Sequence, residues 1–295
     1  MFSAITKPVS LLLFAIVFAA YSTLAGAASV WQVSKDGRHF YLAGTVHLLS
    51  KTDYPLPAAY DIAYRNSEHL VFETDMALLT SPAGIEQLLQ QNTYPPGGDL
   101  QQDLSANVYQ QLVSYSQTRQ LPLAAVTRFK PAFASMMLVT LELQKLGAAE
   151  EGVDAFYLKK AQQDNKTMSG LESLNQHLGI IDALNQLDAD NIMLSTLQDM
   201  SKLETQLGDM KTAWRNGDPK QLEQLFITDL KAFPEFYDIL LLKRNHAWLP
   251  QLEALLQQEK VSLVMVGALH LAGADGLLHQ LEKRGYTLTP VSDTH

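Results

Sequence analysis

Two histidines of this chain lie in the same short motif, in which an apolar run is followed by glycine, two further residues and histidine. The motif occurs at Gly44-Thr45-Val46-His47 and again at Gly267-Ala268-Leu269-His270. Glycine directly after a strand permits a sharp turn or a close backbone approach that a side chain would block. Each imidazole would then lie over the C-terminal end of its strand, so neighbouring strands would bring both into one crevice. The alternative is that each is an ordinary loop histidine.

Two glutamates are predicted at similar places, because each follows an apolar run. Glu73 comes after Leu70-Val71-Phe72, and Glu172 comes after Met168-Ser169-Gly170-Leu171. Open α/β sheets bind ligands at their strand ends, so both glutamates and both histidines are expected on one rim. Imidazoles with carboxylates suit a divalent ion such as zinc, manganese or cobalt that activates a water molecule for hydrolysis. A solvated or ion-paired side chain is the alternative for each glutamate.

Two further groups are weaker candidates for a role in the site. Glu150-Glu151-Gly152-Val153-Asp154 opens a predicted helix, where acidic residues are also expected as caps and partners of the helix dipole. Arg244 and Asn245 could stabilise an oxyanion, although a surface turn of a helix is the alternative. The other histidines have no comparable setting and are interpreted as structural or exposed: His39, His69, His177, His246, His279 and His295.

The spacing of apolar residues predicts the elements that must position these groups. Strands are expected at residues 30–33, 40–43, 68–74, 167–171, 261–266 and 286–290. Helical segments are expected at residues 57–67, 82–91, 105–119, 131–146, 153–163, 174–215, 220–258 and 275–284, with interruptions at Pro234 and Pro250. Strands at both chain ends and in the middle predict one α/β (α+β) domain over residues 28–295, with a split mixed sheet and a helical cap at about 80–260.

Composition excludes several classes of protein. The chain has 295 residues, of which 47 % are hydrophobic and 18 % charged, and this balance is typical of a globular protein. The net charge of −9 without a basic stripe makes a nucleic acid an unexpected partner. The absence of cysteine excludes disulfides and thiol nucleophiles. The sequence also lacks the G-x-S-x-G, P-loop, dinucleotide-binding and H-E-x-x-H motifs.

The first 27 residues have the features of a secretory signal peptide. Lys7 precedes an apolar stretch at residues 9–21, and Ala25-Gly26-Ala27 supplies small residues for cleavage after Ala27. The apolar stretch is shorter than the roughly 20 residues of a membrane span, although an uncleaved anchor is the alternative. We therefore expect a periplasmic or secreted mature protein without a stable membrane span.

The order of these motifs resembles the TraB/GumN family, which also includes the Tiki proteins, over essentially the whole mature chain. The matching blocks are Gly44-Thr45-Val46-His47, Tyr54-Pro55-Leu56-Pro57, Phe72-Glu73-Thr74-Asp75, Glu151-Gly152-Val153-Asp154, Gly170-Leu171-Glu172, Arg244-Asn245 with Trp248, and Val266-Gly267-Ala268-Leu269-His270-Leu271-Ala272-Gly273 with Gly276. The resemblance implies a split α/β core like those of erythromycin-esterase and haem-binding, ChaN-like relatives. In the Tiki branch both motifs and a glutamate are associated with metal-dependent proteolysis, and another branch is associated with peptide pheromones.

The sequence therefore predicts an exported metal-dependent hydrolase that acts on a peptide or protein. His47, His270 and Glu73 would hold the ion, and a remaining glutamate would accept the proton of the bound water. The predicted catalytic residues are Glu73, Glu151, Glu172, Arg244 and Asn245. Two alternatives stay open. One is a peptide-binding or haem-binding protein without turnover, and the other is a metal-free, esterase-like hydrolase with His47 as general base.

Overall fold

The computed structural model describes residues 28–292, so the predicted signal peptide and the terminal His295 lie outside the described residues. Six strands form one sheet in the order β6-β4-β7-β2-β1-β8. They are β1 (Val30–Lys35), β2 (Arg38–Thr45), β4 (His69–Thr74), β6 (Thr167–Glu172), β7 (Ser262–Gly267) and β8 (Thr287–Pro290). Strands β6, β4, β7 and β2 run parallel, whereas β1 runs antiparallel to β2 and β8. The predicted α/β class, with a mixed sheet from both chain ends, is confirmed.

The strands β1 and β2 form the predicted hairpin. Asp36 and Gly37 at its turn both have positive φ angles, 51° and 77°, as a tight two-residue turn between twisted strands requires. Strand β7 pairs with the other side of β2 in parallel, with Thr45 opposite Gly267. This register brings the C-terminal ends of β2 and β7 side by side, and with them the two glycine-histidine motifs.

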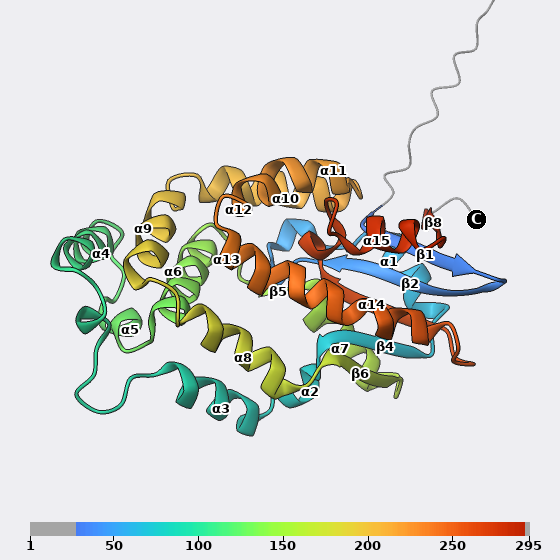
Figure 1. The fold of residues 1–295 in the computed structure, drawn as a ribbon, viewed down its shortest axis with the longest axis horizontal. Helices are drawn as coiled ribbons and strands as arrows, with labels where there is room; N and C mark the ends of the chain where they lie inside the picture. Colours follow the sequence, from blue (N-terminus) through green and yellow to red (C-terminus); the bar gives the residue numbers. More distant parts are fainter. Residues whose placement is uncertain (1–27, 293–295) are drawn as a thin grey trace, which may run out of the picture.

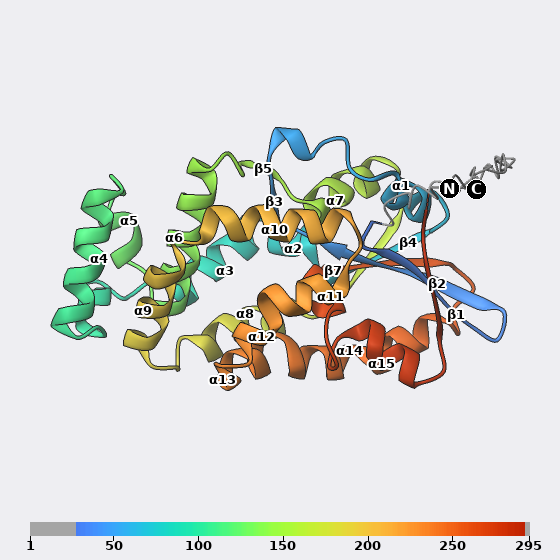
Figure 2. The same ribbon diagram turned by 90° about the horizontal axis from the view of Figure 1, so that it is seen from above.

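Helices cover both faces of the sheet (Figures 1 and 2). The helices against the two faces are α1 (Ala58–Arg65), α7 (Val153–Gln163) and α10 (Leu203–Arg215) on one, and α14 (Lys243–Leu255) and α15 (Leu277–Lys283) on the other. Because side chains alternate along a strand, Leu70 and Phe72 of β4 pack in the first layer and Val71 packs in the second. Central strands that are buried on both faces explain the unbroken apolar runs in the sequence.

A helical region extends away from the sheet (Figure 1). The remaining helices are α2 (Met76–Leu79), α3 (Pro82–Asn92), α4 (Ala106–Thr118), α5 (Ala124–Thr127), α6 (Pro131–Lys145), α8 (Leu174–Leu184), α9 (Ala189–Asp199), α11 (Pro219–Leu222), α12 (Thr228–Leu230) and α13 (Pro234–Tyr237). Leu112, Leu138 and Met193 are fully buried in a separate core between α4, α6 and α9. Within residues 28–292, no helix is long and apolar enough to cross a membrane.

Two details of the predicted helices differ in the structure. The stretch at 174–215 divides into three helices, and the second begins where the Asp188 side chain accepts a hydrogen bond from the Asn191 N–H as an N-cap. Pro250 does not interrupt its helix but lies inside α14. Trp248, Leu249 and Leu252 are fully buried around it, and this packing holds the helix together despite the hydrogen bond that proline removes.

Candidate active site

The ends of the four parallel strands form one rim, and predicted site residues come from all four. Glu73 and Glu172 lie at the ends of β4 and β6. His47 lies two residues beyond β2, and His270 lies in the 3-10 turn that directly follows β7. His47, His270 and Glu73 line one cavity of about 290 Å³ together with Arg244 of α14. The structure therefore brings both imidazoles and one of the glutamates to a single cavity.

Most of the remaining cavity wall is apolar. It is formed by Val46, Met210, Leu230, Leu240, Leu241 and Leu269. An apolar pocket that holds a small number of polar groups is the usual form of a small-molecule or substrate site. Glu73, Arg244 and the two histidines are therefore placed where a bound molecule would meet them.

The glycines of the two motifs allow close packing at this rim. A Cβ atom on Gly267 would lie 3.3 Å from Oε1 of Glu73, and the Gly267 N–H donates to that oxygen at 2.6 Å. A Cβ atom on Gly44 would lie 2.9 Å from Cδ1 of Leu271 and 3.1 Å from Cα of Ala268. A side chain at either position would therefore crowd neighbouring atoms, more severely at Gly44 than at Gly267, as expected from their position after a strand.

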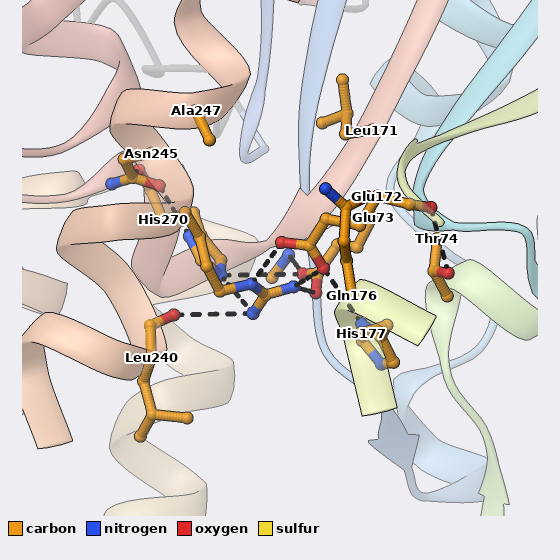
Figure 3. Close-up of polar contacts among 12 residues, drawn as sticks. Glu73, Thr74, Leu171, Glu172, Gln176, His177, Leu240, Asn245, Ala247 and His270 are labelled. Atoms are coloured by element: carbon orange, nitrogen blue, oxygen red, sulfur yellow. Dashed lines mark hydrogen bonds and ion pairs between the residues drawn. The ribbon is translucent and has the colours of Figure 1, made fainter. Parts of the chain in front are cut away.

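Arg244 forms hydrogen bonds with Glu73, Glu172 and His270, whose side chains point toward one another in Figure 3. Its Nε and one terminal nitrogen donate to the two carboxylate oxygens of Glu172 at 2.8 and 3.0 Å. The same terminal nitrogen donates to Glu73 at 2.6 Å, and the other donates to Nε2 of His270 at 3.2 Å. The side chain is 11 % exposed, and its Cζ lies 4.7 Å from the ring centre of Trp248. One buried cation thus links groups from three strand ends.

Both glutamates of the network are ionised. Burial by itself raises the pKa of Glu73, but the positive charges of Arg244 and His47 and the Gly267 N–H hold it well below its usual range. For Glu172, hydrogen bonds from His177 and Arg244 outweigh burial and lower its pKa. No role is predicted for His177 from the sequence, yet its Nδ1 lies 3.2 Å from Oε2 of Glu172. The sequence signal for this contact is that His177 lies in the first turn of the helix that follows β6, five residues after Glu172.

His270 is neutral and is held in one tautomer. Arg244 can only donate, so Nε2 of His270 accepts, and Nδ1 carries the proton that is donated to Oδ1 of Asn245 at 2.7 Å. Burial lowers the pKa of His270 to about 4, because its side chain is only 5 % exposed. Asn245 in turn donates to the backbone carbonyls of His270 and Asp275. Its amide therefore positions the imidazole, and the predicted contact with an oxyanion stays a prediction.

His47 has the opposite surroundings. Its side chain is 66 % exposed, and its Nδ1 lies 3.1 Å from Oδ2 of Asp154, whose side chain is 13 % exposed. Attraction to Asp154 is the largest cause that raises the pKa of His47 to about 9. The sequence predicts Asp154 only as an acidic residue at a helix start. The short pairing of β3 (Leu48–Leu49) with β5 (Glu150–Glu151) brings it to the histidine.

Sequence comparison assigns these residues to a known family. The profile of the TraB/PrgY/gumN family matches residues 29–290. The chain belongs to this family. It is also similar to proteins named YbaP from Escherichia coli strain K12 and Shigella flexneri, each 29 % identical over 248 residues that cover 83 % of this chain and 88 % of the relative. Both relatives are described as uncharacterized, and no solved structure matches the chain. The likeness to erythromycin-esterase and ChaN-like cores therefore stays a prediction.

Glu151 is placed differently from the other predicted catalytic residues. Its carboxylate forms an ion pair with Lys159, and its backbone carbonyl accepts a hydrogen bond from the Tyr54 hydroxyl at 2.8 Å. Glu73, Glu172 and Arg244 by contrast contact one another directly. The structure thus gives Glu151 contacts that hold the segment before α7, beside the Asp154 carboxylate that meets His47.

The atoms of His270 and Glu73 that are expected to bind a divalent ion are already bonded within the protein. Nε2 of His270 accepts from Arg244, and the two oxygens of Glu73 accept from Arg244 and Gly267. Across residues 28–292, no group of three or more histidine, aspartate and glutamate side chains is arranged to hold a metal ion. His270 and Glu73 as arranged therefore do not complete an open set of metal ligands with His47.

Proposed function

We propose that this member of the TraB/PrgY/gumN family is a hydrolase that cleaves an acyl bond, as in a peptide, with His47 as acid and Glu73 as base. The observation that carries the proposal is that one apolar cavity is lined by two groups whose pKa values are shifted in opposite directions. At neutral pH His47 keeps its proton and Glu73 has lost its own. A wide separation between the pKa values of two neighbouring groups is typical of sites in which one group donates a proton and the other accepts one.

The proposed reaction moves one proton in each direction. A water molecule attacks the carbonyl carbon of the substrate, and Glu73 accepts the proton that the water loses. The bond to the leaving nitrogen or oxygen then breaks as His47 donates its Nε2 proton to that atom, which releases an acid and an amine or alcohol. Asp154 bonds Nδ1 of His47 and leaves Nε2 as the donor. Arg244 keeps Glu73 ionised through their 2.6 Å contact.

We further propose that the mature chain acts on a peptide or protein in the periplasm or outside the cell. The support for this location is the charged, apolar and small-residue pattern of residues 1–27. Cell fractionation combined with sequencing of the mature N-terminus tests it. An intact N-terminus in the cytoplasmic fraction would contradict the proposed location.

The test of the reaction is cleavage of an unbiased peptide library and a panel of simple esters by the purified mature protein, read by mass spectrometry. We expect cleavage that persists in a chelator and that is lost in Glu73→Gln, which keeps the shape of the side chain but cannot accept the proton. Cleavage that a chelator abolishes and that zinc, manganese or cobalt restores would contradict this mechanism. That result would support the metal-dependent hydrolase expected from the sequence instead.

Binding without turnover is the second candidate, and one observation favours it. Each nitrogen of the Arg244 guanidinium already donates to a protein acceptor, so the cation has no uncommitted nitrogen to offer a developing oxyanion. Saturable binding of peptides by calorimetry, without any cleaved product, would support this candidate. Visible absorption of the protein as purified tests haem as the bound group.

A further inference from the structure

We infer that Arg244 occupies the position that a divalent cation would take in this site, so that the protein supplies its own fixed cation and excludes the metal ion. Arg244 would have this role at the strand ends whether or not the protein catalyses the proposed hydrolysis. It is carried by the contacts of one guanidinium group with two carboxylates and one imidazole. These are the side-chain types that a divalent ion binds in proteins.

The guanidinium bonds the same oxygen and nitrogen atoms that would ligate a metal ion. Glu172 is held by two parallel hydrogen bonds, Glu73 by one, and His270 through the lone pair of Nε2. A lone pair that accepts a hydrogen bond from Arg244 is not available to a metal ion. Nε2 of His270 lies 3.9 Å from Oε1 of Glu73. These two potential metal-binding atoms therefore face a common space beside the guanidinium.

Arg244 already supplies positive charge to both carboxylates of the site. Glu73 and Glu172 carry two negative charges, and Arg244 neutralises one of them in a site where all three side chains are at most 12 % exposed. A divalent ion added beside Arg244 would place like charges close together in a poorly screened environment. An ion can therefore bind these carboxylate oxygens and Nε2 of His270 only if the guanidinium leaves them.

Contacts other than those with the carboxylates also hold the Arg244 side chain in place. Its Cζ lies over the ring of Trp248, which is fully buried, at 4.7 Å from the ring centre. The residue lies in the first turn of α14, directly after the π-helical segment Asp238–Leu242, and its other terminal nitrogen reaches the carbonyl of Leu240 at 3.5 Å. Stacking, helix and ion pairs all fix the side chain in the same place, so displacement by a metal would break several contacts at once.

The inference predicts that the wild-type chain lacks a tight metal site here and that removal of the guanidinium creates one. Arg244→Leu would leave two carboxylates and a free imidazole nitrogen around an empty position. Arg244→Gln removes the charge but keeps an amide that bonds carboxylates, so it serves as a second neutral variant. Arg244→Lys is the control for charge, because it keeps a positive charge at position 244 without the paired hydrogen bonds of the guanidinium.

The experiment measures binding of manganese(II) and zinc to untagged protein by calorimetry and by metal analysis after dialysis, with circular dichroism to check folding. We expect no stoichiometric ion in the wild type or Arg244→Lys. We expect about one ion per chain in a folded neutral variant, with affinity at least about tenfold tighter than in the wild type. Adding Glu172→Gln to the neutral variant should abolish this binding.

Two results would overturn the inference. One is a stoichiometric ion in the wild type that is lost in His270→Ala, because Arg244 would then not exclude it. The other is a folded neutral variant that binds no more metal than the wild type. If neither neutral variant folds, the wild-type measurement decides alone. Because no substrate is used, inactivity of the protein would contradict the proposed hydrolysis and leave this inference in place.

Discussion

The two glycine-histidine motifs follow neighbouring parallel strands, but the histidines differ in burial, partner and charge. His270 is 5 % exposed, bonds the amide of Asn245 and has a pKa lowered to about 4. His47 is 66 % exposed, bonds the carboxylate of Asp154 and has a pKa raised to about 9. The same motif therefore places one neutral and one protonated imidazole at a single cavity. Burial around His270 and the carboxylate of Asp154 beside His47, and not the motif, decide which proton state each imidazole has.

The largest effect that would separate the two histidines is on turnover. His47→Ala should lower kcat/KM by about 10²- to 10⁴-fold, because the proton donor is lost, while the free energy of unfolding changes by less than about 0.5 kcal/mol. Steady-state kinetics with urea unfolding checks both values. His279→Ala removes an exposed histidine of α15 and serves as the control. Unchanged turnover in His47→Ala would remove His47 from the mechanism.

The next largest effect concerns stability in acid. The folded pKa of His270 lies near 4, below its ordinary 6.5, so the unfolded chain binds more protons between these values. Stability should therefore fall as pH falls from about 6.5 to 4, by an amount on the order of 3 kcal/mol. Urea unfolding of wild type and His270→Gln across this range measures it. Equal slopes in the two proteins would show that His270 is not buried in its neutral form.

A smaller effect should follow from changing the partner of the exposed histidine. Asp154→Asn removes the negative charge that holds the proton on His47, so the pKa of His47 should fall from about 9 toward 6.5. The pH profile of kcat/KM reports the pKa values of groups in the free enzyme, so its alkaline limb should move to lower pH as well. The profile of Asp154→Glu, which keeps the charge, is the control. An alkaline limb that does not move in Asp154→Asn would mean that another group controls it.

The smallest effect is the contribution of His47 to stability in base. Its folded pKa is raised, so the stabilisation is present below about 6.5 and is lost as pH rises through about 9. Because the pair with Asp154 is exposed on the histidine side, solvent screens it and the loss should be below about 1 kcal/mol. Thermal unfolding of wild type and His47→Gln between pH 6 and 10 measures the difference. A larger loss in the variant than in the wild type would reverse the predicted sign.

The parts of the site that could be predicted from sequence are those set by strand ends. An apolar run that ends in glycine or glutamate marks the C-terminal end of a buried parallel strand, and parallel strands end at one edge. His47, His270, Glu73 and Glu172 were therefore predictable as neighbours. Asp154 and His177 were not, because their contacts depend on how the β3–β5 pair and the start of α8 pack against the rim.

The contacts of Arg244 could not be predicted from the sequence either. The sequence marks it as a polar residue on an apolar helix, and an oxyanion contact is one use for such a residue. Its hydrogen bonds to Glu73, Glu172 and His270 join β4, β6 and β7 to α14, and these elements meet only after the chain has folded. Of the three predicted metal ligands His47, His270 and Glu73, this guanidinium contacts His270 and Glu73, whereas His47 contacts Asp154. The sequence marked these side chains as polar groups of one rim without showing which partner each of them has.

Local sequence alone determined the strands, the glycines at their ends and the set of side chains on one rim, because backbone alternation and turn chemistry act over a few residues. Only the tertiary structure decided which imidazole is buried and which carboxylates pair with the Arg244 guanidinium. The physical reason is that desolvation and Coulomb attraction depend on distances between residues that are far apart in the chain, and folding alone sets those distances.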